Sequence, residues 1–245
     1  MPRYKIIVEY NGTDMVGWQR QENGPSVQQY LEEAVESLAQ ETPEVVSAGR
    51  TDAGVHALGQ VAHFDITKEF ENYKIRDALN FHLRGKNIVV VSAEAVDKDF
   101  HARLSAKKRR YLYRILNRRS PPALRHNQVW HVAPPLNTEK MREAMKHLIG
   151  HHDFTTFRAI ECQAKSPMKT LDSISIIEKD DEIHFMFEAK SFLHNMVRKM
   201  VGTLYMVGSG KWQPDDVKKA LEAKDQSASG PTAPAHGLYF LEAVY

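Results

Sequence analysis

The order of hydrophobic periodicities in the first hundred residues constrains the fold more than any other feature of the sequence. Alternating apolar residues predict strands, and apolar residues at helical spacing after the candidate N-cap Ser26 predict a helix. The expected elements are a strand at 4–10, a helix after Ser26, strands before Gly49 and at 61–66, a helix at 72–83 and a strand at 88–96. This β-α-β-β-α-β order defines a ferredoxin-like unit.

The second half of the chain repeats this theme loosely. We expect a strand at 110–116, a helix at 138–149 capped by Gly150, a helix-exit turn at 151–154, paired strands at 170–177 and 183–189, helices at 193–207 and 214–223, and a closing strand at 237–244. The predicted fold is therefore α+β. Two ferredoxin-like halves, residues 1–103 and 104–245, share a central, mainly antiparallel sheet with helices on one side and an active-site cleft between the halves.

Composition limits the cellular setting. No apolar run approaches the roughly 20 residues that span a bilayer, and the N-terminus leads into a strand without a signal-peptide pattern. Cys162 is the only cysteine, so an intrachain disulfide is impossible. These features predict a cytoplasmic protein.

The segment from Gly49 to His56 carries a carboxylate, Asp52, and a guanidinium, Arg50, in a turn with little side-chain bulk. Gly49 and Gly54 permit backbone angles that other residues avoid, so the loop is able to approach a ligand closely. A loop held between two strands is a common place for catalytic groups. The alternative is an aspartate that closes an Asx turn on its own backbone.

A basic stretch follows the first half. Between residues 103 and 119 there is no acidic residue, and the basic ones are Arg103, Lys107, Lys108, Arg109, Arg110, Arg114, Arg118 and Arg119. Although the net charge is only +2, such asymmetry is typical of a protein that binds a polyanion. A solvated basic strand edge, which resists aggregation, is the other interpretation.

Tyr111 and Tyr113 lie on one face of the strand predicted within this stretch. An aromatic side chain flanked by cations suits stacking on a nucleic-acid base while the cations hold phosphates. Alternatively, one or both tyrosines belong to the core with a bonded hydroxyl.

Arg198 lies beside the apolar stripe of the helix predicted at 193–207, and Gly202 one turn later leaves room for close approach. A cation among apolar neighbours needs an anion or several carbonyl partners. Asp52 is one candidate partner, and the pair would keep that carboxylate ionised. A structural ion pair with another acid is the alternative.

Other catalytic chemistries lack a motif. His147, His151 and His152 have no cysteine ligands and no second cluster beside them, so no metal is expected. Neither a phosphate-binding glycine motif nor a serine elbow occurs. Cys162 has no evident base nearby, which favours an inert thiol.

Several ordered blocks resemble the tRNA pseudouridine synthase A (TruA) family along nearly the whole chain. They are Val8–Gly12, Gly17–Gln21, Ala48–Ala57, Asp99–Arg103, Arg109–Tyr113, His152–Phe154, Met196–Arg198 and Gly237–Tyr239. The resemblance implies a homodimer that isomerises uridine to pseudouridine at positions 38, 39 and 40 of the tRNA anticodon stem-loop. It also implies that no cofactor is needed, because the reaction is redox-neutral.

The resemblance assigns roles to several residues. Asp52 resembles the essential carboxylate of the family, and Tyr111 is expected to stack on a flipped base. Arg50, beside Asp52 in the turn, is well placed to fill the vacated stack or hold the adjacent phosphate. Arg198 and Leu238 complete the pocket, Leu238 as an apolar wall. Five basic residues would supply contacts to the RNA backbone: Arg103, Lys107, Lys108, Arg109 and Arg110.

Two other classes of function compete with this one. A non-catalytic RNA-binding module of the same fold is disfavoured by the intact Asp52 loop. A nucleoside hydrolase acting on small substrates is disfavoured by the basic stretch, and a single catalytic carboxylate also argues against an ordinary glycosidase.

Overall fold

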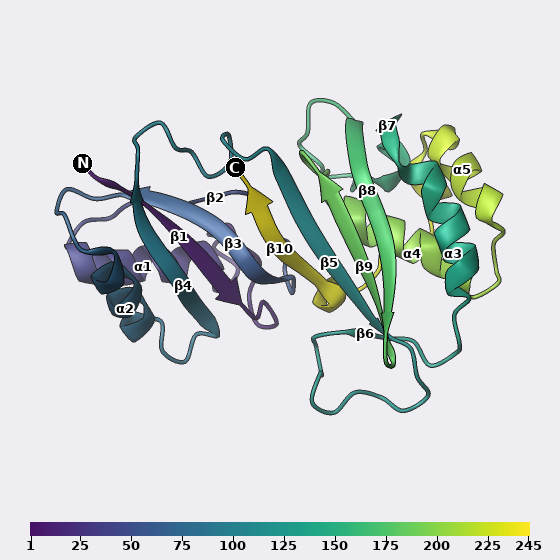
Figure 1. Ribbon diagram of the computed structural model, residues 1–245, viewed down its shortest axis with the longest axis horizontal. Helices are drawn as coiled ribbons and strands as arrows, with labels where there is room; N and C mark the ends of the chain where they lie inside the picture. The colour runs from purple at the N-terminus through teal and green to yellow at the C-terminus, as the bar shows by residue number, and fades with distance from the viewer. The chain divides into compact units, whose positions relative to one another are not determined.

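The computed structural model describes residues 1–245 as a mixed α+β fold with two compact units (Figure 1). The first unit is Met1–Arg109 together with Tyr239–Tyr245, and the second is Arg110–Leu238. The closing strand thus belongs by its contacts largely to the first unit, although it follows the second in sequence.

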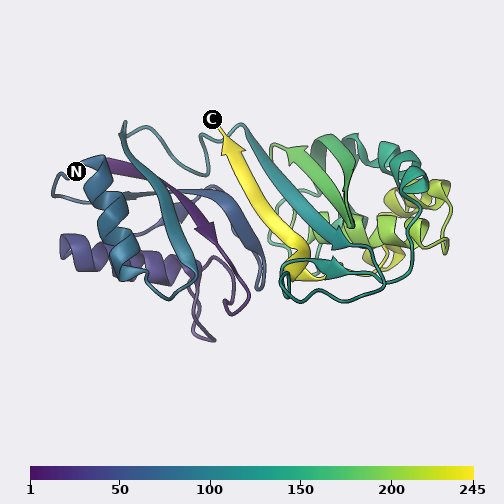
Figure 2. The same ribbon diagram turned by 60° about the horizontal axis from the view of Figure 1, so that its bottom comes forward.

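The first unit has the strand order β4-β1-β3-β10, with β2 also paired to β3. Its strands are β1 (Arg3–Tyr10), β2 (Val46–Ser47), β3 (His56–Asp65), β4 (Ile88–Val96) and β10 (Leu238–Val244), and its helices are α1 (Val27–Ala39) and α2 (Asn72–His82). β1 is antiparallel to both β3 and β4, whereas β10 is parallel to β3. α1 and α2 lie together against this sheet (Figures 1 and 2).

Side-chain alternation in β1 explains this arrangement. Tyr4, Ile6 and Val8 are fully buried, and the residues between them lie on the other face of the sheet. α1 begins as predicted, because the Ser26 hydroxyl accepts a hydrogen bond from the amide of Gln29.

The second unit has the strand order β5-β9-β8-β7, with β6 also paired to β5. Its strands are β5 (Lys108–Leu116), β6 (Trp130–His131), β7 (Gly150–Asp153), β8 (Met168–Lys179) and β9 (Glu182–Ala189). Its helices are α3 (Thr138–Met145), α4 (Met196–Gly208) and α5 (Pro214–Ala223), with short 3₁₀ turns η1 (Lys146–Leu148), η2 (Thr155–Phe157), η3 (Gln226–Ala228) and η4 (Ala235–Gly237). The α+β class with two ferredoxin-like halves is confirmed.

Three local predictions were wrong. α3 ends at Met145 and continues only as the 3₁₀ turn η1. The expected helix-exit turn at 151–154 is largely strand β7, which pairs with β8. α4 starts at Met196 rather than at residue 193, because Asn195 has a φ of 61° and so leaves the right-handed helical region.

Gly202 on α4 has the close approach that its sequence position indicated. A Cβ at this residue would overlap the carbonyl oxygen of Pro231. The segment after α5 therefore lies directly on the helix, and the carbonyl of Arg198 accepts from the amide of Ala233 at 3.1 Å.

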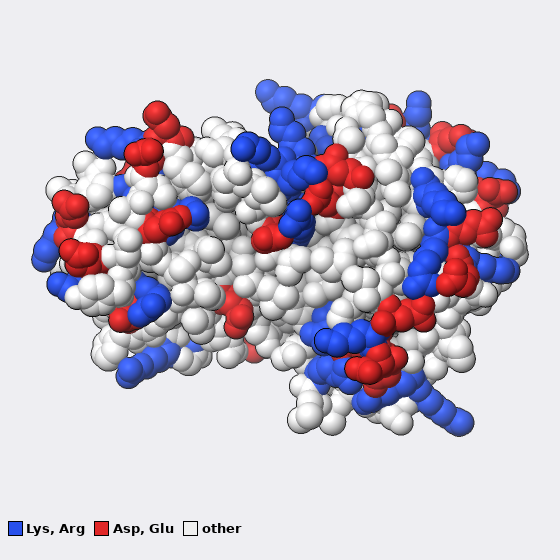
Figure 3. All heavy atoms as spheres, viewed as in Figure 1, with Lys and Arg blue, Asp and Glu red and all other residues white.

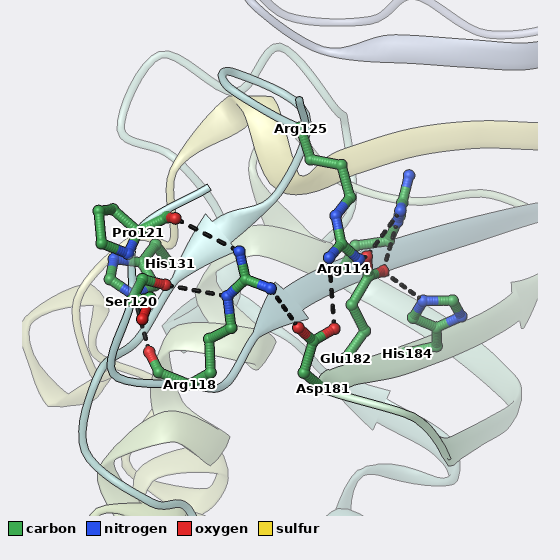
Figure 4. Close-up of polar contacts among 9 residues, drawn as sticks. All are labelled: Arg114, Arg118, Ser120, Pro121, Arg125, His131, Asp181, Glu182 and His184. Atoms are coloured by element: carbon green, nitrogen blue, oxygen red, sulfur yellow. Dashed lines mark hydrogen bonds and ion pairs between the residues drawn. The ribbon is translucent and has the colours of Figure 1, made fainter. Parts of the chain in front are cut away.

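A charged cluster fixes the long segment between β5 and β6 to the β8–β9 turn. In the space-filling view, basic side chains surround acidic ones near this turn (Figure 3). Glu182, only 4% exposed, accepts hydrogen bonds from Arg114, Arg125 and His184 (Figure 4). Asp181 accepts a hydrogen bond from Arg118 at 2.6 Å. The two adjacent acids therefore bind three arginines, one on β5 and two in the segment that follows it.

Burial alone would raise the pKa of Glu182, but hydrogen bonds from Arg114 and His184 outweigh it and lower that pKa to about 2. Glu182 is thus ionised at neutral pH. None of the helices in the structure combines the length and the hydrophobicity needed to cross a membrane.

Candidate functional site

Asp52 lies in a tight turn directly before β3. The backbone carbonyl of Asp52 accepts from the amide of Val55 at 3.1 Å, so the main chain itself closes the turn. Gly54 has a φ of +77°, as its place in the turn required, whereas Gly49 has no positive φ. Asp52 is half-buried and Arg50 is exposed.

The segment after β1 packs against this turn through two glycines. A Cβ at Gly12 would overlap the carbonyl of Val55, and one at Gly17 would lie 2.6 Å from the carbonyl oxygen of Thr51. Trp18 donates its amide to the same Thr51 carbonyl at 3.0 Å. Thr51, the residue before Asp52, is therefore held by a backbone segment that approaches it this closely only because Gly17 has no side chain.

Buried side chains of β1 and β3 form hydrogen bonds that fix the turn. The hydroxyls of Tyr10 and Thr51 lie 2.8 Å apart, and Gln60 donates to the carbonyl of Gly49 at 2.7 Å. The ring of His56 accepts from the amide of Gly12 at 3.0 Å. Burial raises the pKa of Tyr10 to about 12, so its hydroxyl stays neutral.

Arg109, which the sequence assigned to a contact with the RNA backbone, is buried inside the fold. It is only 8% exposed and donates to the carbonyl of Ala48 at 2.9 Å and to that of Ala106 at 3.1 Å. A further bond goes to the carbonyl of Arg103. Its guanidinium thereby ties the start of β5 to the residue preceding Gly49, so Arg109 supports the Asp52 turn from inside the fold.

The other basic residues of the stretch are more accessible. Arg103 and Lys107 are exposed and Lys108 is partly exposed. Arg110 forms an ion pair with Glu188 at 2.6 Å. Contacts of these four residues with RNA stay a prediction.

The two tyrosines of β5 differ in their surroundings. Tyr113 is fully buried and donates its hydroxyl to the carbonyl of Pro234 at 2.8 Å, which makes it the core tyrosine. Tyr111 is 9% exposed, and its ring makes an edge-to-face contact with that of Phe192 at a centroid distance of 5.0 Å. The ring-to-ring contact fixes the orientation of Tyr111, and its role in stacking on a base stays a prediction.

Arg198 projects from the first turn of α4. Its Nε donates to the carbonyl of Ala233 at 2.8 Å, and one terminal nitrogen donates to the amide oxygen of Asn195 at 2.7 Å. The sequence left two possibilities for a cation at this position, an anion or several carbonyl groups, and these two partners are oxygens of the second kind. The pairing of Arg198 with Asp52 stays a prediction.

Leu238 begins β10 and is 6% exposed. The preceding Gly237 is required by the core tyrosine, because a Cβ there would lie 2.6 Å from the ring of Tyr113. Burial lowers the pKa of His236, and the positive charges of His126 and Arg198 lower it further. Leu238 is thus buried next to Gly237, and its part as an apolar wall of a base pocket stays a prediction.

The histidines after α3 make ordinary structural contacts. The ring of His147 lies 3.5 Å from a carboxylate oxygen of Asp215, and His151 contacts the hydroxyl of Thr170 at 3.0 Å. His152 bonds the carbonyl of Ile149. No group of three or more His, Cys, Asp or Glu side chains is placed to hold a metal ion.

Within the first unit, the structure thus assembles a half-buried carboxylate on a turn that is restrained from several sides. Within the second unit, it holds an aromatic ring and a guanidinium near the start of α4. A carboxylate fixed in this way is able to act repeatedly at one position on a bound substrate.

The chain belongs to the tRNA pseudouridine synthase family, whose model matches residues 6–105 and 144–245. It is 56% identical over 245 residues to tRNA pseudouridine synthase A of Paramagnetospirillum magneticum, covering 100% of this chain and 96% of the relative. The protein of the same name from Rhodospirillum centenum is also 56% identical, with 100% of both chains covered. The resemblance inferred from the sequence is confirmed, and so is the enzyme class, an isomerase.

Among solved structures, the crystal structure of a Cbf5-Nop10-Gar1 complex has a TM-score of 0.39 and 10% sequence identity. The match covers 82% of this chain and 44% of that chain.

Sequence patterns did not reveal the residues that restrain the Asp52 turn. Tyr10 and Gln60 look like ordinary strand residues, and Arg109 looks like one more cation in a basic run. A polar residue at a buried strand position was the available signal for Gln60, which is fully buried.

Proposed function

We propose that this protein converts uridine to pseudouridine at positions 38, 39 and 40 of the tRNA anticodon stem-loop, with Asp52 as the catalytic carboxylate. The observation that carries the proposal is the restrained turn. A backbone hydrogen bond from Val55 to Asp52 closes it, and Tyr10, Gln60 and Arg109 hold nearby residues of the segment that leads to Asp52. Membership of the tRNA pseudouridine synthase family supports the same reaction.

In the proposed reaction, the bond between N1 of uracil and C1′ of the ribose breaks. The uracil turns, C5 bonds to C1′, the hydrogen on C5 leaves as a proton, and N1 takes up a proton, so that the product is an isomer of uridine. Asp52 either attacks C1′ of the ribose or assists departure of the uracil by another route. The reaction is redox-neutral, so the proposal includes no cofactor.

A base paired in a stem is out of reach of the carboxylate, so the target nucleotide must be flipped at a cost of a few kcal/mol. Stacking on Tyr111 returns about 1–3 kcal/mol of that cost. Arg50, exposed in the turn, fills the vacated stack or holds the adjacent phosphate. Leu238 supplies an apolar wall and Arg198 a positive charge.

Release of tritium from tRNA labelled at uridine C5 tests the reaction. We expect release with the wild type, none with Asp52→Ala, and nearly unchanged tRNA binding by that variant. Asp14→Ala, which removes an exposed carboxylate from the neighbouring segment, is the matched control and should keep full activity. Equal release by Asp52→Ala and the wild type would exclude Asp52 from the mechanism.

The role of Tyr111 is tested separately. Tyr111→Phe keeps the stacking face and should remain active, whereas Tyr111→Ala should lose roughly tenfold or more in activity. Full activity in both variants would assign the base platform to another residue.

The basic residues are tested by the salt dependence of tRNA affinity. Replacing Lys107 and Lys108 by Ala should reduce the slope of log Kd against log salt by up to about two, one for each phosphate contact. Lys140→Ala, on the exposed face of α3, should leave the slope unchanged. An unaltered slope in the double variant would place the RNA-binding face elsewhere.

We also propose that the protein acts as a homodimer, which the family resemblance implies, and that it lies in the cytoplasm, as its composition predicts. Sedimentation equilibrium across a range of protein concentrations tests the dimer. A monomer at micromolar concentration that retains full activity would contradict it.

A further inference from the structure

The segment between β7 and β8 lies beside the residues to which the proposed function assigns base binding. The amide of Ala159 donates to the carbonyl of His194 at 3.0 Å. His194 stands between Phe192, whose ring meets Tyr111, and Arg198 on α4. The residue before Ala159, Arg158, is therefore placed on the same part of the second unit as Tyr111 and Arg198.

Arg158 differs from most arginines of the second unit in its electrostatic surroundings. Five of them form ion pairs with carboxylates: Arg110, Arg114, Arg118, Arg125 and Arg142. Arg158 has no carboxylate within 4.0 Å. A nearby acid, Asp153, already accepts from the amide and the hydroxyl of Thr155 at 2.9 and 2.6 Å.

The hydrogen bonds of Arg158 are also incomplete. Its Nε is buried and has no hydrogen-bond partner. A single long bond of 3.4 Å joins one terminal nitrogen to the carbonyl of Cys162. An unsatisfied donor on a charged group is costly, and a side chain held by one weak bond reorients with little loss. The guanidinium is thus suited to turn toward an incoming anion and satisfy Nε.

We propose that Arg158 binds a phosphodiester of the RNA substrate, at or next to the nucleotide whose base stacks on Tyr111. This inference rests on the proposed function. The forked guanidinium matches two phosphate oxygens. Ile160, two residues after Arg158, is 82% exposed, so this part of the segment is open to a large ligand. The competing explanation is structural, with the carbon stem of Arg158 filling space beneath the segment.

The affinity of the full-length protein for tRNA, measured over a series of salt concentrations, separates these explanations. Arg158→Gln should raise Kd about tenfold and reduce the slope of log Kd against log salt by about one. Arg158→Lys should keep the slope, because the charge remains, and lose part of the affinity, because the fork is lost. Arg142→Gln removes a partly buried arginine that is paired with Glu139 and Glu178, and should change neither quantity.

Methylphosphonate substitution at single linkages of an anticodon stem-loop RNA gives a second measurement that does not depend on the folding of Arg158→Gln. Substitution at one of these linkages should weaken binding of the RNA to the wild-type protein about tenfold. The same linkage should have a smaller effect on Arg158→Lys, whose cation makes a weaker contact.

Wild-type affinity and slope in Arg158→Gln, or the absence of any linkage that distinguishes Arg158→Lys from the wild type, would overturn the inference. A fall in melting temperature with unchanged affinity would assign Arg158 a structural role. Pseudouridine formation by the wild type is measured in parallel. If the wild type forms none, the proposed function falls and this inference with it, whereas formation with an unchanged slope rejects the phosphate contact alone.

Discussion

The hydroxyl of Tyr10 lies 2.8 Å from the hydroxyl of Thr51, the residue directly before Asp52. Both groups are buried, and Tyr10 belongs to a strand that is paired on both sides. The bond therefore transmits the rigidity of the sheet to the turn that carries the carboxylate.

We expect Tyr10→Phe to lower the rate of pseudouridine formation by about tenfold to a hundredfold, because small displacements of a catalytic group are costly. The stability loss should be about 1–2 kcal/mol, the cost of leaving the Thr51 hydroxyl unsatisfied. Single-turnover rates and calorimetry measure the two effects. Tyr73→Phe, on the exposed side of α2, is the control. An unchanged rate in Tyr10→Phe would show that this bond does not position the turn.

Gly202→Ala should destabilise the protein strongly, by about 3 kcal/mol or more, because the new methyl group would overlap backbone at Pro231. The gain in helix propensity, about 1 kcal/mol, is too small to compensate. In Gly24→Ala the nearest atom is a methyl group of Val16, which is able to move, so the loss should stay below about 1 kcal/mol. Thermal unfolding of both variants measures the difference, and equal losses would contradict the close approach at α4.

Glu182→Gln should destabilise the charged cluster by about 3 kcal/mol, because Arg114 and Arg125 lose a buried anion. Trypsin should then cleave more rapidly within the segment between β5 and β6. Glu178→Gln removes a half-exposed partner of Arg142 and should cost less than about 1 kcal/mol. Unchanged proteolysis of Glu182→Gln would mean that the cluster does not hold this segment.

Stability should also fall with acidity because of His63. Burial, together with the charges of Arg3 and His101, lowers the pKa of this ring to about 4, although the charge of Asp65 opposes the shift. The unfolded chain titrates near 6.5. The contribution of neutral His63 is thus complete above pH 6.5 and is lost as the pH falls toward 4, up to about 3 kcal/mol in all.

Denaturant unfolding from pH 7.5 to 4 measures this loss. His63→Gln should flatten the curve in that interval, whereas His151→Gln, on the exposed edge strand β7, should not. A curve of unchanged steepness in His63→Gln would assign the acid sensitivity to other groups.

Local patterns in the sequence were sufficient for most elements of the fold. Alternation in β1 and helical spacing in α1 arise from contacts with one buried face, and the sequence records them directly. β7 has no such pattern, because its strand character depends on pairing with β8 some twenty residues later. The start of α4 depended on the left-handed conformation of Asn195, which sequence periodicity does not report.

The sequence by itself determined the α+β class, the turn that carries Asp52 and the family to which the chain belongs, because these reside in short ordered segments. Only the tertiary structure decided which groups restrain that turn. It buried Arg109 against the carbonyl of Ala48 and left Arg158 without a carboxylate partner. It also showed that Tyr113 is the fully buried core tyrosine, whereas Tyr111 is not fully buried. The physical reason is that burial and hydrogen-bond satisfaction depend on residues brought together from distant parts of the chain.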